Sequence, residues 1–285
     1  MQTLLVITSR PEDSKILLKY AIGLARDLQM SVHLMYIQDP NIYPTTMPGT
    51  MGNVSVQMQE NLELIAANMK KVLKQQVQEI HKELSPDIPV DFSSRVGIVS
   101  LIATEISSEN EIAAILLEGQ EDKDHWSQTP TNMEIIRHVN CPVWIIPYNS
   151  VYQKFNEIIY AAGYNEADIA TLKKLVLLTG KSSPHITALH ISDNLNFEEN
   201  VKETGFLEMV QAKTGYDKIS VKILVEQRHD ELAHMINDYA QQVNADLIVI
   251  MKENRDFFER IFKSGSAKKI IRHAKLPLLI FHERE

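Results

Sequence analysis

The chain contains a single cysteine, Cys141, among 285 residues. One cysteine excludes an internal disulfide and any Cys-x-x-Cys metal site, and its place beside a proline in an apolar run is typical of a buried side chain. No apolar stretch reaches the roughly 18 residues that a membrane helix needs. The N-terminal apolar run is interrupted by Arg10 and is too short for a signal peptide, so we expect a cytoplasmic protein with no membrane partner.

Positive charge is scarce as well. There are 29 Lys and Arg residues against 37 Asp and Glu residues, a net charge of −8, and no basic stripe. Bulk charge therefore excludes binding to nucleic acid or to anionic membranes. The chain also lacks a Walker A motif, a Gly-x-Ser-x-Gly motif and a Gly-x-Gly-x-x-Gly motif. No nucleophile, base and charge stabiliser stand in register, so we predict that the chain is not an enzyme.

An internal repeat is what the sequence does have. Residues 135–138 (Ile-Ile-Arg-His) precede the apolar run 141–146, and residues 270–273 repeat the same four letters before the apolar run 276–281. Each block reads as a helix end, a turn with Pro and a buried strand. A repeat at this spacing indicates a duplicated α/β unit.

Hydrophobic periodicity places the elements of both copies. Strands are expected at 4–7, 31–37, 90–96, 115–117 and 143–146, then at 158–161, 186–191, 221–225, 247–250 and 277–281. Helices are expected at 16–25, 54–83, 98–107 and 131–138, then at 168–178, 197–213, 231–242 and 266–273. Alternating strands and helices predict two α/β domains, each a mainly parallel five-stranded sheet with helices on both faces. The domains are 1–147 and 157–285, joined by a polar linker, 148–156.

This pattern resembles the universal stress protein family in its tandem form. The residues that carry the likeness are 245–250, 264–267, 270–273 and Pro277 in the second half, and 95–97, 137–138 and 141–143 in the first. The resemblance implies flavodoxin-like sheets and pairwise association of the domains. In many members it also implies ATP at the carboxyl edge of the sheet, held by a signature of Gly, two residues, Gly, nine residues and Gly-Ser.

The phosphate signature is damaged in the second half. An ungapped match puts Met251, Asn254 and Ser264 at the three glycine positions and Gly265 at the serine. Glycines let the backbone approach phosphates, whose charge the amides of a helix N-terminus then hold. All three glycine positions hold other residues in this match, so strong nucleotide binding is not expected.

A one-residue shift gives a second match, with Lys252 and Arg255 at the first two glycines and Gly265-Ser266 retained. An anion could still dock at Ser264-Gly265-Ser266 beside these basic residues. The alternative is a plain helix N-cap with solvated lysines. Gly163 stands where the family usually carries a carboxylate after the first strand.

The first half departs further from the family. Only Gly119 remains of its signature, the loop behind it carries Glu121, Asp122 and Asp124, and Ser9 replaces the carboxylate. Acidic residues would repel a triphosphate. We therefore predict no cofactor, with ATP in the second domain as the alternative.

Two further segments leave alternatives open. The Met- and Pro-rich loop 40–59 is either a lid on its own domain or a surface for a partner. His229-Asp230 and His234 could suggest a metal, but a spacing of five does not place both histidines on one helix face, so no metal site is predicted.

The apolar terminal strands, 142–147 and 276–281, are expected to meet across a pseudo-twofold between the domains, because exposed sheet edges seek partners. The sequence thus predicts a non-catalytic tandem stress protein that acts through protein association. Its partners are its own paired domains, an unidentified protein and, as an open option, a second copy.

Overall fold

The computed structural model describes residues 1–8, 10–40, 53–84, 86–109, 111–119, 130–148, 150–179, 182–192, 194, 196–225, 232–252 and 276–282. The chain divides into two compact units. The first comprises Met1–Glu118, Gln128–Cys141 and Asn149–Tyr152, and the second comprises Gly119–Ser127, Pro142–Tyr148 and Gln153–Glu285. Each is described by itself.

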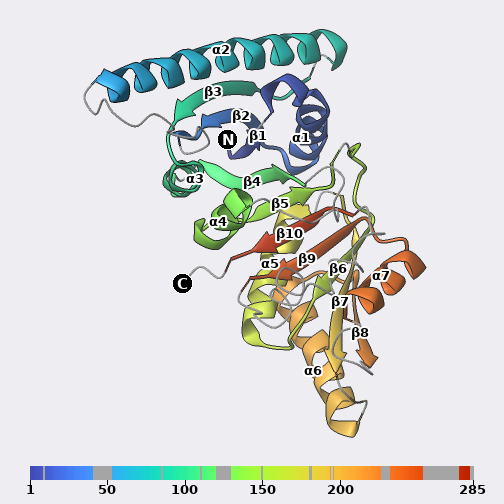
Figure 1. The fold of residues 1–285 in the computed structure, drawn as a ribbon. Coiled ribbons are helices and arrows are strands. Elements are labelled where there is room, and N and C mark those ends of the chain that lie inside the picture. The colour runs from blue at the N-terminus through green and yellow to red at the C-terminus, as the bar shows by residue number, and fades with distance from the viewer. Residues whose placement is uncertain are drawn as a thin grey trace. The chain divides into compact units, whose positions relative to one another are not determined.

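The first unit is a parallel sheet with helices. Its elements are β1 (Thr3–Thr8), the short 3-10 helix η1 (Pro11–Asp13), α1 (Lys15–Leu28), β2 (Ser31–Gln38), α2 (Asn53–Leu84), β3 (Val90–Val96), α3 (Val99–Ser107), β4 (Ile112–Glu118) and α4 (Pro130–His138). The described strands are ordered β3-β2-β1-β4 and all run parallel. The long helix α2 packs along β2 and β3, as Figure 1 shows.

The second unit repeats the plan and contains one further strand. Its elements are β5 (Val143–Ile146), β6 (Glu157–Ala161), α5 (Glu166–Thr179), β7 (His185–Ser192), α6 (Phe197–Thr214), β8 (Ile219–Val225), α7 (Leu232–Gln242), β9 (Leu247–Met251) and β10 (Leu278–Phe281). The described strands are ordered β5-β10-β9-β6-β7-β8 (Figure 1). Only the β5–β10 pair among them is antiparallel.

The core follows from the strand sequences. Residues of β4 from Ala114 to Leu117 and all of β9 are buried. Continuous apolar runs are what strands covered on both faces by helices require. The expected class, α/β with mainly parallel flavodoxin-like sheets, is therefore confirmed. Cys141 is buried as predicted.

The terminal strands of the two copies pair with each other. Trp144 lies opposite Leu279, the residue at the same place in the second copy, while Val143 pairs with Ile280 and Ile145 with Leu278. The register is thus symmetric about Trp144 and Leu279. The prediction that these two strands meet is confirmed, and the pairing explains why β5 groups with the second unit.

Some boundaries differ from the predicted ones. Helix α2 begins at Asn53, so residues 53–59 belong to a helix and not to the loop assigned to 40–59; residues 41–52 lie outside the described part. Helix α5 begins at Glu166, two residues before the predicted start, because Asn165 caps it. The helix predicted at 266–273 also lies outside the described residues.

Candidate functional site

The carboxyl ends of β6 and β9 bound a topological switch point. Strand β6 pairs with β7 on one side and with β9 on the other. The chain passes from β6 to β7 and β8 on the first side and then crosses to β9 on the second side, so the direction of winding reverses between β6 and β9. In open α/β sheets this is where ligands bind. Gly163 follows β6 by two residues and Lys252 directly follows β9. The structure thus brings these two predicted site residues to the same edge.

The loop after β6 is organised around the carboxylate of Asp168. This side chain is 0% exposed. Its Oδ2 accepts hydrogen bonds from the amides of Gly163 at 2.8 Å and Asn165 at 3.1 Å. Its Oδ1 accepts one from the Tyr160 hydroxyl at 2.7 Å. The loop amides that could have faced a ligand therefore donate to an internal group.

Asn165 and Asp168 also form a capping box at the start of α5. The Asn165 Oδ1 accepts from the Asp168 amide at 3.0 Å, while Asp168 accepts from the Asn165 amide. Such reciprocal bonds satisfy two backbone donors at a helix start. This arrangement fixes where α5 begins.

Tyr164 lies between the two amides that donate to Asp168. Its backbone is left-handed, with φ of 59°, a conformation uncommon outside glycine. Its ring stacks on His190 with a centroid distance of 4.1 Å and packs against Phe206 at 4.8 Å. His190 Nδ1 donates to the Ala162 carbonyl at 2.8 Å. The loop is held by packing from β7 and α6 as well as by Asp168.

The end of β9 is closed by a side chain. Met251 is 3% exposed, and its sulfur accepts a hydrogen bond from the buried Thr171 hydroxyl of α5 at 3.5 Å. The adjacent Lys252 amide donates to the Phe281 carbonyl of β10 at 2.9 Å. In the ungapped match to the phosphate signature, Met251 stands at the first glycine. Its side chain fills space that a glycine would leave open.

Burial dominates the electrostatics of this edge. It raises the pKa of Asp168 above its ordinary value, against the opposing effect of the Tyr160 hydroxyl and the Asn165 and Gly163 amides. Burial, with Asp168 next to it, also raises the pKa of the Tyr160 phenol well above its usual range. Charged forms of both groups are disfavoured, which is the opposite of an activated nucleophile.

Four of the predicted site residues, Arg255, Ser264, Gly265 and Ser266, lie outside the described residues. Of the other two, Gly163 contributes an amide to Asp168, and Lys252 begins the segment after β9. Sequence reasoning missed Asp168 itself. The signal that could have found it is the Asn-x-x-Asp spacing of 165–168, a capping box at the end of a strand.

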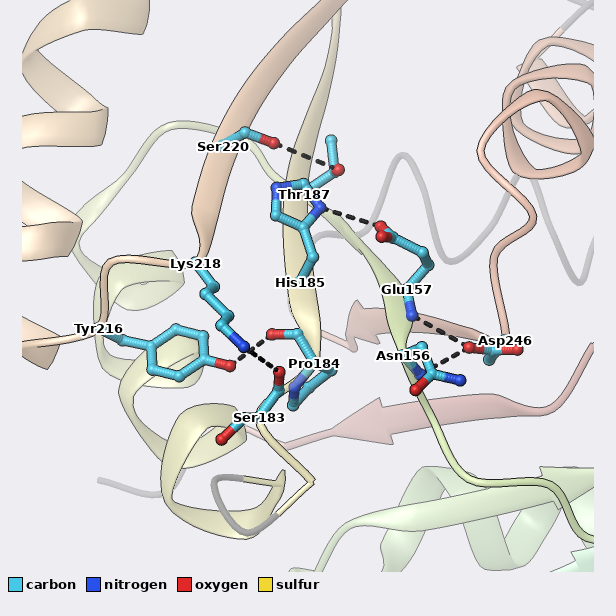
Figure 2. Close-up of polar contacts among 10 residues, drawn as sticks. All are labelled: Asn156, Glu157, Ser183, Pro184, His185, Thr187, Tyr216, Lys218, Ser220 and Asp246. Atoms are coloured by element: carbon cyan, nitrogen blue, oxygen red, sulfur yellow. Dashed lines mark hydrogen bonds and ion pairs between the residues drawn. The ribbon is translucent and has the colours of Figure 1, made fainter.

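The opposite edge of the same sheet carries structural contacts (Figure 2). The Asp246 carboxylate accepts the amides of Asn156 at 2.6 Å and Glu157 at 3.0 Å. Glu157 also contacts His185 Nδ1 at 2.9 Å. Lys218 Nζ donates to the Ser183 carbonyl at 3.2 Å. These bonds join the starts of β6, β7, β8 and β9 and give no sign of a ligand.

Within the described ranges, no group of three or more His, Cys, Asp or Glu side chains could hold a metal ion. The same part of the chain contains no helix with the length and apolar character to cross a bilayer.

The fold is a doubly wound α/β sheet with loops at a topological switch point. Domains of this class commonly bind nucleotides, and the chain contains two domains of this kind. The model of the universal stress protein family matches residues 1–147 and 154–282. The chain therefore belongs to the universal stress protein family, as the resemblance in its motifs indicated.

Solved structures agree with this fold. A universal stress protein from Archaeoglobus fulgidus matches with a TM-score of 0.64 and 13% identity, over 99% of this chain and 97% of that one. A functionally unknown protein from Pseudomonas aeruginosa matches at 0.59 and 16%, over 99% and 92%. The cytoplasmic domain of a prokaryotic cation chloride cotransporter matches at 0.54 and 10%, over 98% and 94%. Identities this low establish the fold alone. No curated protein matches the chain.

Proposed function

We propose that this chain is a non-catalytic universal stress protein that acts in a stress response through protein association, with a degenerate nucleotide site. The observation that carries the proposal is the closed edge at the switch point of the second unit. Met251 packs on Thr171 where the family signature has its first glycine, and the Gly163 and Asn165 amides donate to Asp168. Each such contact removes room or donors from an incoming phosphate.

The association part of the proposal rests on two surfaces. The symmetric β5–β10 register supports pairing of the two domains within one chain. Helix α6 offers a second surface, because Phe197, Val201 and Met209 are 83%, 53% and 51% exposed. Their spacing of four and eight residues puts them on one face of the helix. Large exposed apolar side chains on one side of a helix make it a candidate interaction surface.

The second candidate function is an ATP-binding stress sensor that uses the second domain. Lys252 favours it, since a cation directly after β9 lies at the switch point where phosphates bind in this fold class. Under this alternative, Arg255 and Ser264-Gly265-Ser266 would complete an anion site. The damaged signature weighs against it, so it ranks second.

Native mass spectrometry of the purified protein tests both. We expect a protein mass without co-purifying nucleotide. An adenine nucleotide retained at near-stoichiometric level would contradict the proposal and favour the sensor.

The same instrument tests association as the concentration is raised. If a dimer forms through α6, Val201→Glu with Met209→Glu should dissociate it, whereas Leu177→Glu, at a 77% exposed site on α5, should not. A dimer that persists in the α6 double variant would show that α6 is not the interface.

A further inference from the structure

Strand β8 lies at the edge of the sheet in the second unit. Its one strand neighbour among the described residues is β7. The Ile186 amide of β7 donates to the Lys218 carbonyl at 2.9 Å, and Ile186 pairs with Ile219. In a parallel ladder with this register, every second residue of β8, beginning with Ser220, directs its amide and carbonyl toward β7. The residues between them direct these groups away from the sheet.

The outward-facing backbone groups belong to Ile219, Val221, Ile223 and Val225. Within the described ranges, no backbone hydrogen bond involves the outward groups of Val221 or Ile223. Such a row of open donors and acceptors is a template for a further strand. The edge of β8 therefore offers the hydrogen-bonding groups that an extended peptide needs.

One face of β8 is apolar. Ile223 is in register with His190, whose ring stacks on Tyr164 on the side of the sheet where α6 packs. The side chains of Val221 and Val225 lie on the same face, because they are two residues away in a strand. Val225 is 40% exposed, so apolar surface remains open at this end of the edge.

The opposite face of β8 carries positive charge. Lys222 stands at the middle of the strand and is exposed, and in the described part of the chain it forms no ion pair. Ser220 lies on the same face, with its hydroxyl 3.4 Å from that of Thr187 (Figure 2). A strand docked on β8 therefore has a cation beside this face.

We propose that β8 is a docking edge for an extended segment of another protein whose side chains alternate between apolar and acidic. The segment extends the sheet through the outward backbone groups of Val221 and Ile223. Its apolar side chains lie on the α6 face, and a carboxylate lies beside Lys222. This inference rests on the proposed function, association with proteins, and names the kind of partner.

A second copy of β8 is a poor occupant of this edge. The antiparallel register that pairs all of Ile219–Val225 with itself puts Lys222 opposite Lys222. Like charges directly opposite one another destabilise a strand pair, and a lysine on an edge strand is a common protection against self-pairing. The same side chain thus disfavours the chain's own edge and attracts an acidic segment.

Fluorescence polarisation of the full chain with labelled synthetic peptides of seven residues, the length of β8, tests the charge preference. One probe alternates valine with glutamate, and its control alternates valine with lysine. The net charge of −8 would favour the lysine peptide through bulk attraction, so a preference for glutamate indicates a local cation. We expect saturable binding of the glutamate peptide, and binding of the lysine peptide that is about tenfold weaker.

Two charge variants locate the preference. Lys222→Glu should reverse it, so that the lysine peptide binds more tightly than the glutamate peptide. Lys174→Glu, which changes the net charge equally at an exposed site on α5, should leave the preference unchanged.

Amide hydrogen exchange tests the backbone part of the proposal. The Val221 and Ile223 amides should exchange fast in the free chain and slowly with saturating glutamate peptide, while the Lys222 amide, which faces β7, stays slow in both states. Val221→Pro removes one outward N–H and leaves the bonds to β7, so it should weaken peptide binding. If this variant does not fold, exchange in the wild type decides the point.

Three results would overturn the proposal. One is slow exchange of the Val221 and Ile223 amides in the free chain, which would show that the edge is already covered. The second is binding of the glutamate peptide that Lys222→Glu leaves unchanged, and the third is no saturable binding of the glutamate peptide. None of these affects the measurement of co-purifying nucleotide, so failure of this inference is distinguishable from failure of the proposed function.

Discussion

Asp246 and Asp168 perform the same task at opposite edges of one sheet. Each carboxylate accepts two backbone amides, Asp246 at 2.6 and 3.0 Å and Asp168 at 2.8 and 3.1 Å. They differ in access to water, because Asp168 is fully buried and Asp246 is half-buried. The comparison separates the effect of hydrogen bonding from that of burial. At Asp168 burial raises the pKa although the Tyr160 hydroxyl and the Asn165 and Gly163 amides oppose it, so there burial outweighs the three hydrogen bonds.

The first unit shows that a charge is not needed at this place. Strands β1 and β6 correspond in the repeat, since Thr3 pairs with Ser31 just as Glu157 pairs with His185. At the same offset Ser14 corresponds to Asp168; it is also buried, and its hydroxyl donates to the Pro11 carbonyl at 2.8 Å. This bond lies in the turn before α1, and the Ser14 side chain makes no capping hydrogen bond to that helix. The carboxyl group of Asp168 is a feature of the second copy alone.

The largest expected effect is that of removing each carboxylate. Asp168→Ala leaves the Tyr160 hydroxyl and two amides without their acceptor in a dry site, so unfolding free energy should fall by about 3 kcal/mol. Asp246→Ala should cost about 1 kcal/mol, because water can reach its donors. Denaturant titration measures both. Equal losses would mean that burial does not distinguish the two sites.

The pH dependence of stability gives the next effect. Because the pKa of Asp168 is raised in the folded chain, the folded state holds this proton more tightly than the unfolded state does. Stability should therefore fall as pH rises from about 3.9 to the raised value, and level off above it, by about 1.4 kcal/mol for each unit between the two. This slope should appear when the unfolding free energy of Asp168→Asn is subtracted from that of the wild type at each pH. A difference that is flat, or rises with pH, would contradict the sign.

The substitution Asp168→Ser gives the second unit the same residue type that the first unit has at the corresponding position, Ser14. A hydroxyl can accept one of the three hydrogen bonds, so we expect a loss of about 1–2 kcal/mol, less than for alanine. Thermal unfolding alongside Asp168→Ala checks the order. A serine variant no better than alanine would show that this position needs a carboxyl group.

The smallest effect is expected at the amino edge. The contact between His185 and Glu157, at 2.9 Å, has side chains that are 39% and 36% exposed. Surface pairs of this kind contribute about 0–1 kcal/mol and are screened by salt. Glu157→Gln should therefore change denaturant stability by less than about 0.5 kcal/mol at moderate salt. A loss as large as that of Asp168→Ala would reverse the ranking of the two edges.

Much of the fold could be predicted because strand signals here are strong and repeated. Buried apolar runs such as Ile145-Ile146 and Leu247–Ile250 indicate strands covered on both faces, and the same order of helix and strand occurs in both halves of the chain. Gly163 and Lys252 lie at the same edge because each follows a strand and the ends of parallel strands share an edge, while their role as a binding site stays a prediction.

Asp168 could not be predicted from its position alone. An aspartate in the first turn of a helix is ordinarily a solvated capping residue, and nothing local reveals that β6 and β7 will exclude water from it. The left-handed backbone of Tyr164 is likewise a product of tertiary packing on His190 and Phe206. Both depend on contacts between residues distant in sequence.

Calorimetric titration of the purified chain with MgATP tests the central claim most directly, namely that the second domain's switch-point edge is closed to nucleotide. We expect no saturable heat at low-micromolar concentrations, since the side chain of Met251 and the bonds to Asp168 replace what a phosphate would need. Low-micromolar affinity that Gly265→Asp abolishes would contradict the account and make the chain an ATP-binding member of its family.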